Sequence, residues 1–368
     1  MNSCKRCLIP STKPHITFDS DGVCNACLSH DKKKKGKSAI DWEKRNDQFL
    51  KLLKIVSKKS ATHYDVLVPV SGGKDSISQV AKILESDFSL RVLAVSVDYG
   101  IKTEIGRRNL DLIPAMGCTL ITYRPNLQIH KNLVRIGFEK YGDPDLFSHA
   151  LLHAIPLRIA ANFKIPLVWC GENSAYEYGG PKEIAESPEM SEKWFNDFAA
   201  HGSKALNEIA KEEGITEEET LMYTFPKNLE KTTEAHFMSY YFPWDSSTNL
   251  ETAQRYGFMA LDKPFEGTFR KYHGIDEKIH RIHQYLKLMK FGYGRATDHA
   301  CEEIRNGRIT REEGKKLVME FEYQEISNEY LEDFANFIGW DVGKCKEVIE
   351  RFRNMKIWRK KNNSYSLR

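Results

Sequence analysis

The chain has 368 residues and a mass of 42.5 kDa, with 29% charged and 41% hydrophobic residues and a mean hydropathy of −0.52. This composition excludes disordered and fibrous proteins, and no apolar run approaches the ~18 residues of a membrane-spanning helix. The formal charge is +4, but seven basic residues and no acidic one fall within residues 351–368. Removing these charges leaves −3 for the rest, which argues against a broadly basic nucleic-acid binder. The first residues lack the apolar region of a secretion signal, so we expect a cytoplasmic protein without a membrane partner.

The first segment, residues 1–30, contains half of the eight cysteines as two Cys-x2-Cys pairs with sixteen residues between them: Cys4, Cys7, Cys24 and Cys27. Two such pairs are typical of a tetrahedral Zn²⁺ site. Four thiolates fill the coordination sphere, so we expect a structural site, without which so short a segment could not bury a core. Disulfides and an iron–sulfur cluster are the alternatives.

Residues 31–63 are expected to form a linker and a helix. The lysine-rich run of residues 32–37 is interpreted as a solvated linker, with an anion or RNA contact as the alternative. An amphipathic helix is predicted over residues 39–59. Its apolar face would consist of Phe49, Leu52, Leu53 and Val56.

Residues 64–225 alternate short apolar runs with helical patterns. Strands are predicted at residues 65–70, 91–98, 119–123 and 165–170, with helices between them. This order predicts an α/β fold, in which a parallel sheet carries helices on both faces. Ligands bind such sheets beyond the carboxyl ends of the strands. Residues 226–368 are predicted to be a mostly helical C-terminal region, for example over residues 274–290.

The loop after the first predicted strand reads Ser71-Gly72-Gly73-Lys74-Asp75-Ser76. Its glycines let the backbone approach a ligand closely, and N–H groups at a helix start bind anions. The carboxylate of Asp75 suits such a site if Mg²⁺ accompanies the phosphates. The glycine spacing does not match the Walker A motif. A glycine turn that only begins a helix is the alternative interpretation.

Polar residues also follow the second and fourth predicted strands. Asp98 could contact a ribose or a metal ion, or it could be a turn residue. Glu172, next to Gly171, is a candidate Mg²⁺ ligand. Asn173 is a candidate phosphate or substrate contact, with a helix cap as the alternative.

The stretch from Tyr176 to Gly180 places two tyrosines around a carboxylate. The aromatic faces of Tyr176 and Tyr178 offer a stacking surface for a sugar ring, and Glu177 offers acceptors for its hydroxyl groups. A purely structural aromatic loop is the alternative.

The loop of residues 71–76 resembles the PP-loop of the ATP pyrophosphatase superfamily. It occurs together with the cysteine pairs, the stretch of residues 171–180 and the octapeptide Lys263-Pro-Phe-Glu-Gly-Thr-Phe-Arg270. In this combination, from Cys4 to about Glu322, the chain resembles the N-acetyl sugar amidotransferases of bacterial surface-polysaccharide (lipopolysaccharide O-antigen) biosynthesis.

This resemblance implies a PP-loop fold and conversion of an acetamido group of an N-acetylated sugar, nucleotide-linked or nonulosonic, to an acetamidino group. ATP would adenylylate the amide oxygen, and ammonia would displace AMP. The expected catalytic residues are Lys74, Asp75 and Glu172, with Asp75 and Glu172 binding Mg²⁺. The expected ATP-binding residues are Ser71, Gly72, Gly73, Lys74, Asp75, Ser76, Asp98, Gly171, Lys263 and Arg270, where surface charge is the alternative for the last two. The expected sugar-binding residues are Asn173, Tyr176, Glu177 and Tyr178.

The chain has no recognisable glutaminase domain, because the remaining cysteines lack the His and carboxylate setting of a cysteine nucleophile. The family draws ammonia from a separate glutaminase through a cyclase-like partner, so such partners are implied by resemblance. A PP-loop tRNA thiolase is the alternative enzyme, although no Cys-x2-Cys pair occurs outside the first segment. A zinc-bearing assembly protein with a degenerate nucleotide site is a third hypothesis, against which the intact Lys74, Asp75 and Ser76 argue.

Overall fold

Five parallel strands form the central sheet of this computed structural model. The structure describes residues 2–34, 39–59, 63–174, 177, 184, 187–199, 206–227, 229, 233–361 and 364–368. The strands are β1 (Val66–Pro69), β2 (Val92–Val97), β3 (Thr119–Tyr123), β4 (Leu167–Cys170) and β5 (Glu234–Phe237), in the order β3-β2-β1-β4-β5. Val66 of β1 pairs with Val92 of β2 on one side and with Leu167 of β4 on the other. The predicted α/β class with a parallel sheet is therefore confirmed.

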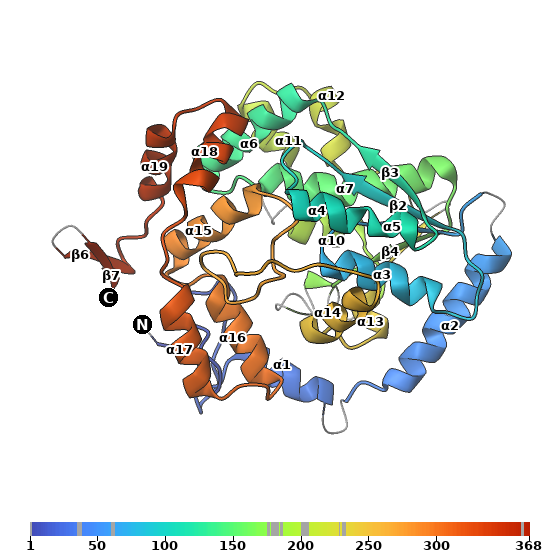
Figure 1. The fold of residues 1–368 in the computed structure, drawn as a ribbon, viewed down its shortest axis with the longest axis horizontal. Coiled ribbons are helices and arrows are strands. Elements are labelled where there is room, and N and C mark those ends of the chain that lie inside the picture. Colours follow the sequence, from blue (N-terminus) through green and yellow to red (C-terminus); the bar gives the residue numbers. More distant parts are fainter. Residues whose placement is uncertain are drawn as a thin grey trace.

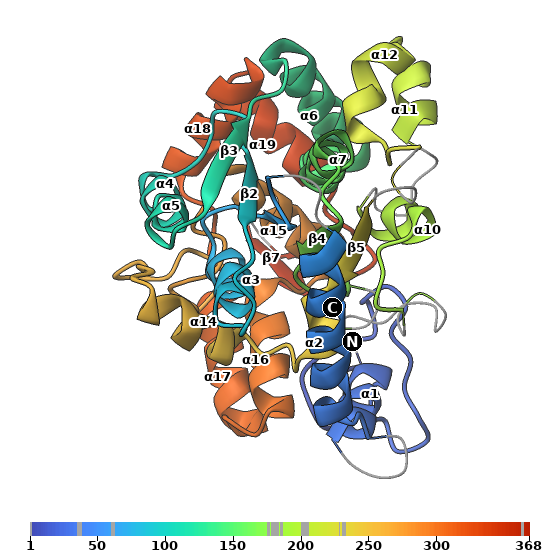
Figure 2. The same cartoon turned by 90° about the vertical axis from the view of Figure 1, so that its right-hand side faces the viewer.

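Alternate residues of the buried strands face two separate layers of helices, which Figure 2 shows on either side of the sheet. Val66 and Val68 pack with α2 (Trp42–Lys59), α3 (Lys74–Leu84), α4 (Glu104–Leu110) and α5 (Leu112–Ala115). Leu67 faces the opposite layer, which includes α6 (Leu127–Tyr141) and α7 (Leu146–Phe163). Because side chains alternate along a strand, a continuous run of apolar residues serves both layers.

The fifth strand was not predicted from the sequence. β5 joins the sheet beside β4 with Cys170 opposite Phe237, and it lies beyond residue 225, where the α/β segment was expected to end. The next helices, α13 (Met238–Tyr241) and α14 (Ser246–Arg255), also pack on the layer that contains α3. The segment between β4 and β5 contains α10 (Glu192–Trp194), η1 (Phe195–Ala199), α11 (Leu206–Glu212), α12 (Glu217–Thr220) and η2 (Leu221–Tyr223).

The C-terminal region is mostly helical, as predicted. It contains α15 (Ile279–Phe291), α16 (Arg295–Arg305), α17 (Arg311–Phe321), α18 (Asn328–Ile338) and α19 (Val342–Arg351), followed by the hairpin of β6 (Trp358–Lys361) and β7 (Ser364–Leu367). The cysteine segment and α1 (Asn25–Lys34) lie beside α16 and α17 (Figure 1). In this contact the Arg311 side chain donates to the carbonyl oxygens of Cys7 and Cys4, at 3.0 and 3.2 Å. Among the described residues, no helix combines the length and the apolar character that a membrane span requires.

Candidate functional site

The loop between β1 and α3 has a backbone conformation that requires glycine. Gly72 has φ of +97°, and a Cβ atom there would lie 2.3 Å from the carbonyl oxygen of Gly106. Gly73 precedes α3 as its N-cap and has no side chain to bond the first N–H groups of the helix. These groups are therefore available to an anion. Within the loop, Ser71 N–H donates to Ser76 Oγ at 2.9 Å, and Gly73 N–H donates to Ser71 Oγ at 3.2 Å.

The charged side chains of this loop are fixed by their neighbours. Lys74 Nζ lies 2.7 Å from both carboxylate oxygens of Asp75. Asn249 of α14 donates from Nδ2 to Asp75 Oδ1 at 2.8 Å and accepts from Ser78 Oγ at 3.2 Å. Lys102 donates from Nζ to the carbonyl oxygen of Ser71 at 3.0 Å. Asn249 and Lys102 were not predicted, because no local pattern marks residues that reach the loop only in the folded chain.

Glu172 follows β4, which is the neighbour of β1 in the sheet. The chain runs from β1 to β2 on one side, while β4 and β5 lie on the other, so the crevice between β1 and β4 is the switch point where such sheets bind ligands. Gly171 permits close packing there, because a Cβ atom would lie 2.7 Å from Gln79 Nε2. Burial, together with the charges of Asp75 and Glu177, raises the pKa of Glu172 to about 7.

A cavity of about 420 Å³ opens beside these residues, a volume within the usual range for a small-molecule site. Four parts of the chain line it. They are Ile9, Lys13, Ala26, Ser29, His30 and Trp42 at the N-terminal side; Lys74, Asp75, Glu172 and Glu177 at the sheet; Pro243, Trp244, Asp245, Ser246 and Thr248 before and in α14; and Arg270, His273, Arg295, Asp298, His299, Cys301, Glu302, Arg305 and Asn306 in the C-terminal region. The structure thus brings together Lys74, Asp75, Glu172, Glu177 and Arg270 of the predicted site.

The C-terminal side of this cavity contains two histidines that sequence reasoning missed. His273 Nε2 accepts a hydrogen bond from Arg295 Nε at 2.9 Å, and His299 Nδ1 lies 3.0 Å from Thr268 Oγ1. Burial, assisted by nearby cations, holds the pKa of both imidazoles well below the usual value. Both are therefore neutral at pH 7 and can exchange hydrogen bonds with a ligand. No motif marked them, since they reach the cavity from separate segments.

Arg270 lines the cavity, but its charge is already compensated. Its Nη1 donates to Glu302 Oε2 at 2.8 Å, and its Nη2 contacts Glu303. These ion pairs argue against the predicted phosphate contact of Arg270, because its guanidinium already interacts with two carboxylates. Lys263 is exposed and is absent from the lining of the cavity, so nothing in this structure supports a phosphate role for it.

Two other predicted contacts are engaged within the protein. Asp98 Oδ2 accepts from Arg124 at 2.8 Å, and its Oδ1 accepts from Gly100 N–H at 2.8 Å. Burial opposes ionisation of Asp98, but these partners outweigh it and lower its pKa. The Asn173 amide accepts from Trp194 Nε1 at 2.9 Å and donates to the carbonyl oxygen of Ile184 at 3.1 Å. It thus braces the end of β4. Tyr176, Tyr178 and residues 35–37 lie outside the described residues.

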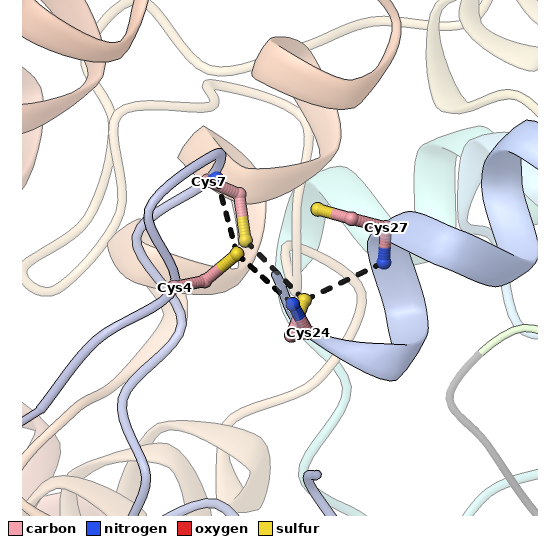
Figure 3. Close-up of side chains that lie close together, drawn as sticks. All are labelled: Cys4, Cys7, Cys24 and Cys27. Carbon is pink, nitrogen blue, oxygen red and sulfur yellow. Dashed lines mark hydrogen bonds between the residues drawn. The ribbon is translucent and has the colours of Figure 1, made fainter. Parts of the chain in front are cut away.

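The four cysteines of the first segment converge on one point (Figure 3). All four side chains are buried, and their sulfur atoms lie within 4.8 Å of one another. Cys7 Sγ is 3.7 Å from Cys24 Sγ, close to the ~3.8 Å that tetrahedral geometry with Zn–S bonds of ~2.3 Å requires and far from a disulfide. All eight cysteines, each among the described residues, are free. Cys7 N–H and Cys24 N–H donate to Cys4 Sγ, as in metal-bound cysteine turns. This donor set could hold zinc.

Comparison with known proteins places part of this chain in a functional context. Residues 266–368 match the family model described as "LPS biosynthesis protein WbpG-like, C-terminal domain". No significant match was found among curated proteins. The match supports a place among the enzymes of bacterial lipopolysaccharide biosynthesis. The matched region supplies Arg270, His273 and one face of α16, from Arg295 to Arg305, to the cavity described above.

Proposed function

We propose that this protein is a PP-loop, ATP-dependent amidotransferase that converts an acetamido group of an N-acetylated sugar to an acetamidino group. The observation that carries the proposal is the shared cavity. Lys74, Asp75 and Glu172, at the switch point of the sheet, face Arg270, His273 and Arg295 from the region that matches the WbpG-like family. One cavity thus joins an anion-binding loop with the part of the chain related to lipopolysaccharide biosynthesis.

The sheet side of the cavity has the features that ATP requires. The first N–H groups of α3, which no side chain caps, can donate hydrogen bonds to phosphate oxygens. Lys74 adds a positive charge there. Asp75 and Glu172 supply two carboxylates, and Mg²⁺ commonly binds through one or two carboxylates together with substrate phosphates. Such an ion would neutralise the charge that develops on departing pyrophosphate. The positions of Asp75 and Glu172 support this assignment.

The remaining walls suit a sugar. Trp42 and Trp244 line the cavity and offer aromatic faces, while the Glu177 carboxylate offers acceptors for hydroxyl groups. The two tryptophans can therefore supply the stacking surface that was assigned to Tyr176 and Tyr178 from the sequence. Trp244 also packs against Gly171 next to Glu172, where a Cβ atom on the glycine would lie 3.2 Å from Trp244 Cη2.

The chemistry follows from the weakness of an amide as an electrophile. The amide oxygen attacks the α-phosphorus of ATP, and the bond to pyrophosphate breaks. Ammonia then adds to the activated carbon, the carbon–oxygen bond breaks, and AMP leaves with the original amide oxygen. Lys74 lies where it can stabilise the phosphate charge. We further propose that separate glutaminase and cyclase-like subunits supply the ammonia.

The experiment combines the purified chain with ATP, Mg²⁺, ammonium chloride and a panel of N-acetylated surface sugars. Mass spectrometry would follow the sugars, AMP and pyrophosphate in one tube. The proposal predicts a sugar in which NH replaces one oxygen, formed in step with AMP. Lys74→Ala should abolish AMP formation, whereas Lys263→Ala, which alters an exposed lysine outside the cavity, should retain it. If no sugar changes and AMP appears only with tRNA and a sulfur donor, the thiolase hypothesis replaces this one.

A further inference from the structure

The cysteine segment does more than fold around its own sulfur atoms. Leu8 N–H donates to Cys301 Sγ of α16 at 3.3 Å, and Thr12 Oγ1 donates to the carbonyl oxygen of Phe291 at 2.6 Å. Ile9 is buried together with Tyr293 and Cys301. These contacts hold residues 8–13 against the helices that form the C-terminal side of the cavity, so that Lys13 lines it.

Lys13 belongs to a group of charged side chains around Asp298 in which cations outnumber carboxylates. Asp298, at the start of α16, pairs with Lys287, and it also accepts a weaker contact from Arg295 at 3.3 Å. Its pKa is lowered to about 2: burial opposes ionisation, but Lys287, Arg295 and Lys13 outweigh it. One carboxylate therefore faces three cations. Glu322 also lies near Asp298, but it already accepts hydrogen bonds from Gly294 and Thr297.

Two of these cations face the cavity. Lys287 matches the charge of Asp298 from outside the cavity lining, so Lys13 and Arg295 are the cations of this group that line the cavity. The Lys13 side chain makes no hydrogen bond or ion pair with any residue in the described ranges. Arg295 is held in place through its bond to His273. Cations in a partly closed cavity favour an anionic ligand, because an opposite charge offsets their lost hydration.

Arg305, another cation of the cavity lining, has a different role. It lies seven residues after Asp298 on α16, which corresponds to ~10 Å along the helix. Its charge interacts mainly with the sulfur atoms of Cys301, Cys7 and Cys27. Arg305 therefore compensates the negative charge of the cysteine cluster, and Lys13 with Arg295 forms a separate group.

We propose that the cysteine segment is a wall of the substrate cavity, and that Lys13 on this wall together with Arg295 binds an anionic group, a carboxylate or a phosphate, of the substrate. The inference rests on the proposed function for the identity of the ligand as an N-acetylated sugar. It makes the metal held by the four cysteines a determinant of sugar binding, because the metal fixes the segment that carries Lys13. The loop at α3 lies outside that segment, so ATP binding should not depend on the metal.

Calorimetric titration of the full chain with matched sugars tests the anionic contact. One pair is N-acetylneuraminic acid and its methyl ester, which differ in a carboxylate. The other is N-acetylglucosamine 1-phosphate and N-acetylglucosamine, which differ in a phosphate. The charged member of at least one pair should bind about tenfold more tightly, the value of one charge-assisted contact. The pair that discriminates identifies the anionic group.

Lys13→Gln should remove most of this discrimination and leave the affinity for the neutral sugar unchanged. Lys13→Arg should restore it. Lys5→Gln is the matched control, since Lys5 is an exposed lysine of the same segment outside the cavity lining. Equal affinity for both members of each pair, or discrimination that persists in Lys13→Gln, would overturn the proposal.

Removing the metal with a chelator that binds Zn²⁺ but not Mg²⁺ tests the role of the wall. Sugar affinity should fall at least tenfold, while a fluorescent ATP analogue should bind as before. Unchanged sugar affinity would refute the role of the segment. If ATP binding is also lost, the metal stabilises more of the protein than the cysteine segment. The titrations of Lys13→Gln then test the anionic contact without removal of the metal. Binding that depends on Lys13 without any acetamidino product would uphold this inference while refuting the proposed function.

Discussion

Glu172 lies in an environment that differs strongly from that of an ordinary glutamate in water. Its pKa of about 7 lies above the value of 4.5 for a free side chain, because burial and the charges of Asp75 and Glu177 disfavour the carboxylate. The folded protein therefore holds a proton between pH 4.5 and 7 that the unfolded chain releases. Stability must then fall as the pH rises through this interval and stay lower above it.

Glu172→Gln should remove this pH dependence. In the absence of nucleotide and added Mg²⁺, the variant should be more stable than the wild type at pH 8 by about 1–3 kcal/mol. The difference should shrink as the pH falls towards 4.5 and vanish below it, where the wild-type carboxyl is protonated in both states. Thermal unfolding from pH 5 to 8 measures it. Equal melting temperatures at pH 8 would show that the carboxyl ionises without cost.

Gly72 and Gly73 are adjacent but differ in what they tolerate. A Cβ atom at Gly72 would lie 2.3 Å from a backbone oxygen, and its φ is +97°, whereas at Gly73 the nearest atom would be Ser71 Oγ at 3.3 Å. Gly72→Ala should therefore cost at least 1–3 kcal/mol of stability, roughly the strain of an unfavourable backbone conformation. Gly73→Ala is the matched control and should cost less. Melting temperatures compare the two, and equal losses would contradict this packing.

At the scale of elements, the cysteine segment depends on its metal. Four buried sulfur atoms draw together residues that form hardly any regular structure before α1. We expect one zinc ion per chain, with most of it lost in Cys24→Ser. Cys345→Ser, which alters a buried cysteine of α19 outside the cluster, should keep the metal. Elemental analysis by mass spectrometry measures the zinc content of each variant. Zinc retained by Cys24→Ser would show that the cysteine cluster is not the zinc site.

The elements predicted best from the sequence are those whose conformation follows from neighbouring residues in the chain. β1, β2 and β4 consist almost entirely of apolar residues before a glycine or acidic turn, so their positions could be predicted within a few residues. β5 could not, because Glu-Ala-His-Phe becomes a strand only through its pairing with β4. Lys74, Asp75 and Glu172 could be placed near one another because parallel strands end at one edge.

Apart from Arg270, the C-terminal half of the candidate site could not be predicted. Trp244, His273 and Arg295 reach the cavity, and Asn249 reaches Asp75, through the packing of segments that no local pattern connects. Lys13 is a particular case, since it belongs to a segment whose cysteines suggested only a structural role.

At the scale of the whole molecule, the cavity is a junction of four distant parts of the chain. Binding of ATP with Mg²⁺ should protect amides mainly in residues 71–77 and 171–173. Adding an N-acetylated sugar should extend protection to residues 8–13 and 295–306, because ordering one wall of the cavity orders its neighbours. Hydrogen exchange with mass spectrometry measures both patterns. Protection that never reaches the C-terminal walls would contradict a shared site.

The central claim is that the amide oxygen of the sugar ends on AMP. An N-acetylated sugar labelled with oxygen-18 in its acetamido group, incubated with ATP, Mg²⁺ and ammonium, tests it directly. We expect AMP that carries one labelled oxygen, in an amount equal to the acetamidino product. Label found in inorganic phosphate together with ADP, or retained in the sugar, would contradict adenylylation of the amide.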